Sequence, residues 1–113
     1  MNRTVIQTRK FSQILDDLIS QGKLTDADFE EFEQSLVKDP QQGDLLQGTG
    51  GVRKTRLKSA SKGKRGGFRV CYFDDSNNNE LFLLIIYPKN VKESLTQPEK
   101  AVLKAFTEAI KGR

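Results

Sequence analysis

The stretch Leu81–Tyr87 reads LFLLIIY and is apolar apart from the hydroxyl group of its tyrosine. It is far too short to cross a bilayer, which takes about 20 residues of helix. An apolar run of this length, closed by Pro88, predicts a central strand that is buried on both faces of a sheet. Any fold of this chain must therefore surround that strand.

Two amphipathic helices are predicted ahead of the central strand. The apolar residues of the first recur at helical spacing: Phe11, Ile14, Leu15, Leu18 and Ile19. Those of the second do the same: Phe29, Phe32 and Leu36. Gly22 is placed to end the first helix. Thr25 and Asp28 have the spacing of a capping box for the second, and Pro40 stops it.

The remaining elements complete a small α+β fold. Three further strands are predicted: Thr4–Thr8, Val52–Lys58 and Phe68–Phe73. A last helix starts at the capping box Thr96/Glu99 and carries an apolar stripe of Val102, Leu103, Phe106, Ala109 and Ile110. The expected order is β-α-α-β-β-β-α. Helices would pack on a small antiparallel sheet, in one domain over residues 1–113.

The composition excludes several kinds of chemistry. The chain has no histidine and a single cysteine, Cys71, so it lacks the residues for a histidine triad, an internal disulfide or a structural zinc site. Cys71 lies in an apolar run, which favours a core residue over a nucleophile. The N-terminus is polar and shows no signal-peptide pattern. We expect a cytoplasmic protein without metal, cofactor or membrane association.

Positive charge is concentrated in the middle of the chain. Residues 1–44 carry nine acids and five bases, and residues 74–113 carry six of each. Residues 45–73 contain no acid and eight bases: Arg53, Lys54, Arg56, Lys58, Lys62, Lys64, Arg65 and Arg69. This distribution indicates a surface that binds nucleic acid. The alternative is a solvated loop that only keeps the protein soluble.

Alternation along Val52–Lys58 separates its side chains. Lys54, Arg56 and Lys58 fall on one face, and Arg53 shares the other with Thr55 and Leu57. Charges at alternate strand positions lie about 7 Å apart, close to the phosphate spacing of a single strand. Four aromatic residues near this strand or the next ones are candidates for stacking on bases, although each also suits the core: Phe68, Tyr72, Phe73 and Tyr87.

A cluster of cations can cleave RNA without histidine or metal. Arginine side chains stabilise the charge that develops on phosphate, and a lysine crowded by other cations loses its proton more readily and can act as a base. The reaction requires the 2′-OH, so it would select RNA over DNA. The residues alone leave open whether this cluster cleaves RNA or only binds it.

The run GDLLQGTGGVRKTRLKSASKGKRGGFRV, followed by IIYPKN and LT-x-x-E-K, resembles the RelE/ParE superfamily of toxins from bacterial type II toxin–antitoxin modules. The resemblance is strongest to the HigB branch and extends over nearly the whole chain. It implies the RelE-like fold and a ribosome-dependent endoribonuclease, an mRNA interferase that cuts mRNA in the ribosomal A site and inhibits translation.

The resemblance also implies which residues act. By position, Lys54 and Arg56 match the paired basic residues of the second strand, Arg69 matches the arginine that opens the third, and Lys89 falls near the basic position after the fourth. The C-terminal tyrosine of some relatives has no counterpart here, so Lys54 is the first candidate for the general base and Tyr87 the second. Arg69 would stabilise the transition state, and Arg56 would bind phosphate or protonate the leaving group. The expected contacts to the RNA backbone are Arg53, Lys58, Lys62, Lys64 and Arg65.

The implied partners are a HigA-like antitoxin with a helix-turn-helix domain, the ribosome with its mRNA, and operator DNA through the toxin–antitoxin complex. Two alternatives stay open. A ParE-like toxin would share the fold but act on DNA gyrase without nuclease activity. A basic module that binds RNA or the ribosome would need no catalysis at all.

Overall fold

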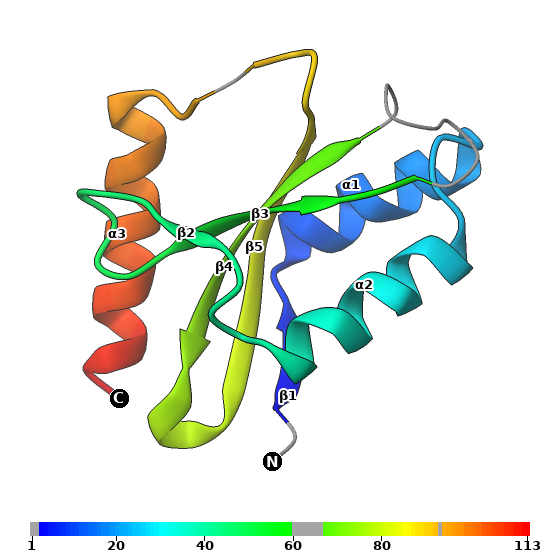
Figure 1. The fold of residues 1–113 in the computed structure, drawn as a ribbon. Coiled ribbons are helices and arrows are strands. Elements are labelled where there is room, and N and C mark those ends of the chain that lie inside the picture. The colour runs from blue at the N-terminus through cyan, green and yellow to red at the C-terminus, as the bar shows by residue number, and fades with distance from the viewer. Residues whose placement is uncertain (1–2, 60–66, 93) are drawn as a thin grey trace.

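The computed structural model describes residues 3–59, 67–92 and 94–113. Figure 1 shows its elements in chain order. The strands are β1 (Thr4–Gln7), β2 (Asp44–Leu45), β3 (Arg53–Leu57), β4 (Phe68–Asp75) and β5 (Glu80–Pro88). The helices are α1 (Arg9–Ser20), α2 (Asp26–Lys38) and α3 (Gln97–Lys111), and a 3-10 turn, η2 (Ser76–Asn78), joins β4 to β5.

The strands described here form one sheet in the order β1-β5-β4-β3-β2. From β2 to β5 every neighbouring pair is antiparallel, which confirms the predicted meander. β1 pairs parallel to β5, so the sheet is mixed where the sequence analysis expected an antiparallel one. The direction of an edge strand depends on the connection that joins it to its partner strand, and the long connection from β1 to β5 permits the parallel pairing. β2 lies between the second helix and β3, where the sequence predicted no strand, and it pairs with Arg53 and Lys54.

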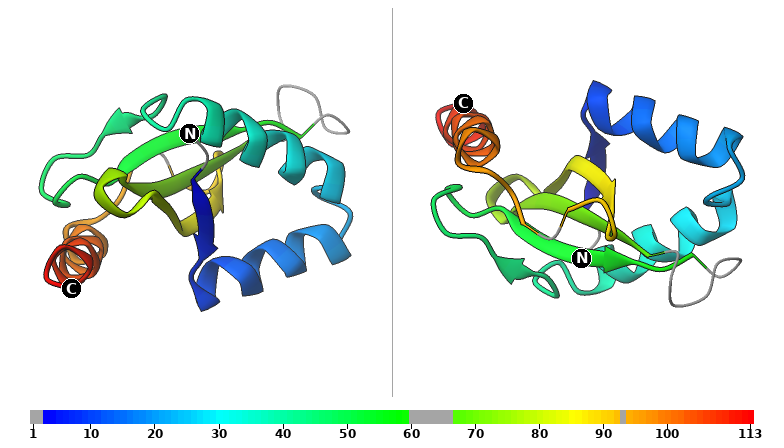
Figure 2. Two further views of the ribbon diagram at one scale, coloured as in Figure 1. Left: turned by 90° about the horizontal axis from the view of Figure 1, so that it is seen from below. Right: turned by 90° about the horizontal axis from the view of Figure 1, so that it is seen from above.

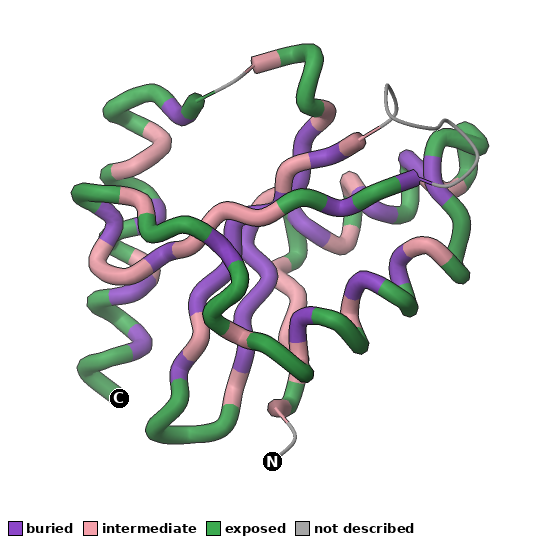
Figure 3. Tube along the Cα trace, viewed as in Figure 1, coloured by how far each residue is buried: buried purple, intermediate pink, exposed green. Residues whose placement is uncertain are grey.

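The sheet has helices on both faces. Figure 2 shows α1 and α2 on one side of the strands and α3 on the other. β5 supplies Leu81, Leu83 and Ile86 to the core under α1 and α2, and Phe82, Leu84 and Tyr87 to the core under α3. The predicted central strand is therefore confirmed. Buried residues follow β4 and β5, whereas the outer faces of the helices are exposed (Figure 3).

The helix ends have the predicted chemistry. Thr25 Oγ1 accepts from the N–H of Asp28 at 3.0 Å, and the Asp28 carboxylate accepts from the N–H of Thr25 at 3.2 Å. The same capping box joins Thr96 and Glu99 at α3. Gly22 follows α1 with φ of +73°, a conformation that glycine adopts without strain. These local signals set where α2 and α3 begin and where α1 ends.

A β-bulge in β5 changes which residues face α3. Cys71 lies opposite Ile85 and Tyr72 lies opposite Leu83, so β5 has an extra residue, Leu84, at this point. The alternation of β5 shifts by one residue beyond the bulge. Tyr87 consequently points to the α3 face, although strict alternation from Phe82 would place it on the opposite one.

The glycine-rich loop before β3 is fastened to α3. The Thr107 hydroxyl, fully buried, donates to the carbonyl oxygen of Thr49 at 2.9 Å. Gly50 has φ of +76° and packs against Thr107 so closely that a Cβ atom would collide with its hydroxyl oxygen. Lys111 Nζ donates to the Gly50 carbonyl at 2.5 Å. These contacts fix the start of β3 relative to α3 and so place the cations that follow.

Candidate functional site

Three side chains form a row across the sheet on its α3 face. Arg56 of β3 lies opposite Arg69 of β4, and Arg69 lies opposite Tyr87 of β5. Residues opposite one another in a sheet project from the same face. The flanking residues Leu57 and Phe68 enter the core under α1 and α2, which places Arg56 and Arg69 on the other face. The row lies where β3 ends, β4 begins and β5 ends (Figure 1).

Lys54 belongs to the next row on the same face. It lies opposite Cys71, which in turn lies opposite Ile85. Cys71 is fully buried, and burial raises the pKa of its thiol to about 12 although the positive charges of Lys54 and Lys92 act to lower it. Near neutral pH Cys71 is therefore an unreactive thiol in the core, as the sequence suggested.

The two arginines have the surroundings of an anion site. Arg56 and Arg69 carry like charges directly opposite one another, an arrangement that is unfavourable in a sheet. Within residues 3–59, 67–92 and 94–113, the ion pairs involve other residues and neither arginine has a carboxylate partner. Arg56 is exposed and Arg69 half-buried. An anion bound between them would relieve the repulsion and accept charge-assisted hydrogen bonds.

Tyr87, the third residue of the row, has a buried side chain. It is 7% exposed, and in the described part of the chain its hydroxyl group has no hydrogen-bond partner. Burial, followed by the neighbouring Cys71, raises the pKa of Tyr87 to about 12, although the charge of Arg69 acts to lower it. The side chain is a neutral phenol near neutral pH, so it is better suited to donate a hydrogen bond than to remove a proton.

Lys89 and Lys58 flank the row. Lys89 is exposed and follows β5 directly, and its N–H donates to the Gly67 carbonyl at 3.2 Å. This bond holds Lys89 at the same end of the sheet as Arg69. Lys58 is exposed and follows β3, beyond Arg56. Both predicted cations are thus close to the row in the fold.

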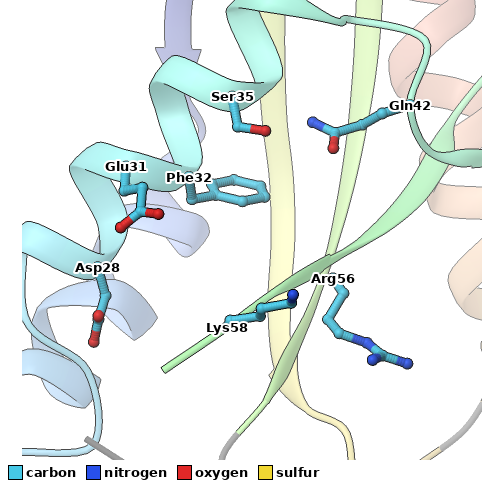
Figure 4. A pocket seen from close by; sticks show the side chains of 7 residues that line it. All are labelled: Asp28, Glu31, Phe32, Ser35, Gln42, Arg56 and Lys58. Atoms are coloured by element: carbon cyan, nitrogen blue, oxygen red, sulfur yellow. The ribbon is translucent and has the colours of Figure 1, made fainter. Parts of the chain in front are cut away.

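Arg56 and Lys58 also line a groove of about 450 Å³ between β3 and α2. Figure 4 shows its opposite wall, on which Asp28 and Glu31 of α2 stand beside the ring of Phe32. Ser35 and Gln42 complete the lining. The groove therefore has a basic wall and an acidic wall. It lies at the edge of β3 rather than over the row of Arg56, Arg69 and Tyr87.

Arg53 lies away from the other candidates. It projects to the α1/α2 side with Leu57, as alternation predicted, and its guanidinium donates to the carbonyl oxygens of Gly43 at 2.7 Å and Gln41 at 3.3 Å. The hydroxyl of Tyr72 binds the same loop, donating to the Pro40 carbonyl at 2.8 Å. Arg53 and Tyr72 are therefore occupied in holding the chain between α2 and β2.

Five other residues that the sequence suggested for RNA contact are not seen at the row. Phe68 and Phe73 are buried, 4% and 7% exposed, so their rings belong to the core rather than to a stacking surface. Lys62, Lys64 and Arg65 lie outside the described residues.

Two residues beside the row were missed from the sequence. Lys92 Nζ lies 5.0 Å from the centre of the Tyr87 ring and forms an ion pair with Glu99 of α3. Glu99 was recognised only as a helix cap. Its ion pair with Lys92 depends on the turn after β5, and no local sequence pattern predicts that pair.

Comparison with known proteins identifies the family. The family model described as the RelE toxin of the RelE/RelB toxin–antitoxin system matches residues 3–112. The chain belongs to the RelE toxin family. It is therefore a RelE-like toxin of a toxin–antitoxin system, and this membership implies a cognate antitoxin as partner.

A solved structure carries the same fold as this RelE-family toxin. A mutant of the E. coli toxin RelE in the free state superposes with a TM-score of 0.56 at 16% sequence identity. The match covers 90% of this chain and 96% of that one. In the parts of this toxin that the structure describes, no helix has both the length and the apolar character needed to cross a membrane.

Proposed function

We propose that this toxin is a ribosome-dependent endoribonuclease that cuts mRNA in the ribosomal A site and so inhibits translation. The observation that carries the proposal is the row Arg56–Arg69–Tyr87 with Lys54 beside it, on the α3 face of the sheet. Two arginines without carboxylate partners among the described residues are suited to bind the backbone of RNA.

The proposed mechanism uses side chains alone. Lys54 removes the proton of the 2′-OH, and the resulting oxygen attacks the adjacent phosphorus. Arg69 stabilises the additional negative charge on the phosphoryl oxygens through charge-assisted hydrogen bonds from its guanidinium. The bond to the 5′ oxygen breaks, leaving a 2′,3′-cyclic phosphate, and the 5′ oxygen takes up a proton. Arg56 supplies this proton or, if it only binds the phosphate, water does. No step requires a metal ion.

The remaining cations bind rather than react. Lys89 and Lys58 contact the RNA backbone on the two sides of the row. Tyr87, neutral and next to Arg69, donates a hydrogen bond to the substrate when the covering side chains give access to its hydroxyl. Arg53 is left out of the proposed site because its guanidinium binds the Gln41 and Gly43 carbonyls.

The motifs GTGG-x-RK-x-R and IIYPKN support placing the toxin in the HigB branch. The proposed partners follow from that branch: a HigA-like antitoxin with a helix-turn-helix domain, and operator DNA bound by the complex of the two proteins. Cytoplasmic localisation is proposed with them, because ribosomes and mRNA are there.

Primer extension on a defined message tests the proposal. Wild type, Lys54→Ala, Arg69→Ala and the control Lys10→Ala, an exposed lysine of α1, are compared with and without programmed ribosomes. We expect ribosome-dependent cuts with wild type and Lys10→Ala, and none with the other two, all four proteins having the same circular dichroism. A message left whole while growth still stops would contradict the nuclease proposal. It would point to DNA gyrase or to occupation of the ribosome without cleavage.

A further inference from the structure

The segment between β5 and α3 returns a lysine to the cationic row. A turn after β5, closed by the N–H of Val91 donating to the Pro88 carbonyl at 3.2 Å, reverses the chain. Lys92 then lies over the Tyr87 ring, with Nζ 5.0 Å from the ring centre. This is a cation–π contact. Lys92 is thus a third cation beside the row that already contains Arg56 and Arg69.

Glu99 holds Lys92 in this position. Its Oε2 atom pairs with the Lys92 ammonium group, while Oε1 accepts from the N–H of Thr96 at 2.9 Å and from the Thr96 hydroxyl at 3.2 Å. The two oxygens thus serve different partners, one the lysine and one the helix cap. The hydrogen bond from Lys92, followed by the one from Thr96, keeps the pKa of Glu99 below its ordinary value, so the carboxylate stays charged.

Lys92 retains the capacity to bind a further anion. An ammonium group has three N–H donors, and Glu99 together with the Tyr87 ring faces only part of them. The side chain is 32% exposed, so solvent and ligands reach it. Its charge also acts to lower the pKa of the buried Cys71 thiol, as does that of Lys54.

We propose that Lys92 is a further contact of this site to RNA phosphate and that Glu99 is the residue that positions it. The proposal rests on the proposed function, because it assumes that RNA is the ligand of the row. Lys92 provides the charge, and Glu99 restricts that charge to the place above Tyr87 where a phosphate bound by Arg69 would meet it. Without Glu99 the charge would remain but would sample many positions.

A purely structural reading gives different expectations. If the Lys92–Glu99 pair only fastens the β5–α3 segment, its loss lowers thermal stability and leaves the salt dependence of RNA binding unchanged. Counterion release separates the two readings, because each phosphate contact contributes about 0.7 to the slope of log K against log salt for a single strand.

The experiment is a salt titration of binding to a fluorescent single-stranded RNA oligonucleotide, with melting curves for every protein. Lys92→Met keeps the length of the stem, Lys92→Arg restores the charge, and Glu99→Gln keeps an oxygen for the Thr96 cap. Lys104→Met, on an exposed position of α3, is the matched control. We expect Lys92→Met to reduce the slope by about 0.7 and to weaken binding several-fold at low salt, while Lys92→Arg and Lys104→Met retain the wild-type slope. Glu99→Gln should keep the slope and weaken binding less than Lys92→Met does.

Three results would overturn the inference: equal slopes for Lys92→Met and Lys104→Met, no rescue by Lys92→Arg, or no binding of the oligonucleotide by wild type at low salt. An affinity of Glu99→Gln equal to that of wild type would remove the positioning role alone. Failure of the proposed function is distinguishable, because it shows as the absence of ribosome-dependent cuts by wild type. The slopes decide the role of Lys92 whether or not the message is cut.

Discussion

The two faces of the sheet are built from the same strands but differ in what they contain. Under α1 and α2 the strands present mainly core residues, among them Leu57, Phe68, Val70 and Leu83, and Phe11 of α1 packs on them with no exposed area. The cation of β3 on this face, Arg53, is bound to the carbonyl oxygens of Gln41 and Gly43. On the α3 face the same strands present Cys71 and Phe73 to the core and Arg56 and Arg69 to the row. One face stabilises the fold, and the other is divided between core and charge.

This difference shows how a small domain holds cations together. A strand that is packed on one face is rigid, so the backbone positions from which side chains leave its other face are fixed. Arg56 and Arg69 repel one another, and the well-filled α1/α2 face offsets that cost. Substitutions on the two faces should therefore separate stability from activity.

The largest effect is expected from the core under α1. Phe11→Ala removes a fully buried ring and leaves a cavity, which should lower the free energy of unfolding by about 3–5 kcal/mol. Urea denaturation monitored by circular dichroism measures it. The matched control is Phe106→Ala on α3, a half-buried ring that should cost less. Equal losses would contradict the view that the α1/α2 face carries most of the stability.

Removal of charge from the row should affect activity instead. Arg69→Ala should reduce ribosome-dependent cleavage by about 10²–10³-fold, the usual cost of losing one preorganised donor to a transition-state oxygen. The free energy of unfolding should stay within about 0.5 kcal/mol of wild type, because the repulsion from Arg56 disappears together with the side chain. Single-turnover cleavage and urea denaturation of the same preparation check both parts. A variant that loses activity because it unfolds would speak against the division of faces.

Loss of the hydrogen bond that joins α3 to the loop before β3 should have an intermediate effect on the free energy of unfolding. Thr107→Val deletes the hydroxyl that donates to the Thr49 carbonyl, and it leaves a buried acceptor without its partner. The expected loss is about 1–3 kcal/mol of unfolding free energy. Thr107→Ser keeps the hydroxyl and should lose less. A Thr107→Ser variant as unstable as Thr107→Val would show that the methyl group, rather than the hydrogen bond, secures the loop.

The smallest effect concerns alkaline pH on the α3 face. The folded protein raises the pKa of both Cys71 and Tyr87 to about 12, from ordinary values of 9.0 and 10.0. Because these groups are neutral when protonated, the stability they contribute is fully present below about pH 9 and is lost as the pH rises toward 12. Melting temperatures of Tyr87→Phe should therefore fall less than those of wild type between neutral pH and pH about 11. Parallel decreases in the two proteins would show that Tyr87 is not a source of the alkaline sensitivity.

Much of the fold was predictable because its signals are local. The capping boxes at Thr25 and Thr96, the apolar stripes of the first two helices and the run Leu81–Tyr87 each act over a few residues, and the structure confirms them. The stripe predicted for α3 is confirmed only in part: Leu103 and Ile110 are buried, whereas Val102 and Ala109 are exposed. Alternation along the strand also predicted that Arg53 projects from the opposite face of the sheet to Lys54 and Arg56. The parallel direction of β1 was not predictable, since its partner β5 lies far away in the sequence. β2 was missed for another reason: it has two residues, too few to show an alternating pattern, although its partner β3 follows closely.

The sequence by itself determined the elements of this protein and the concentration of positive charge on and after β3. Tertiary structure decided which of these charges meet. The bulge at Leu84 turned Tyr87 toward Arg69, the loop at Gly43 bound Arg53 on the opposite face, and the turn after β5 brought Lys92 to Tyr87. The physical reason is range: helix caps and periodicity arise between near neighbours, whereas the facing of a strand residue depends on the register with strands that pair only when the whole sheet has formed.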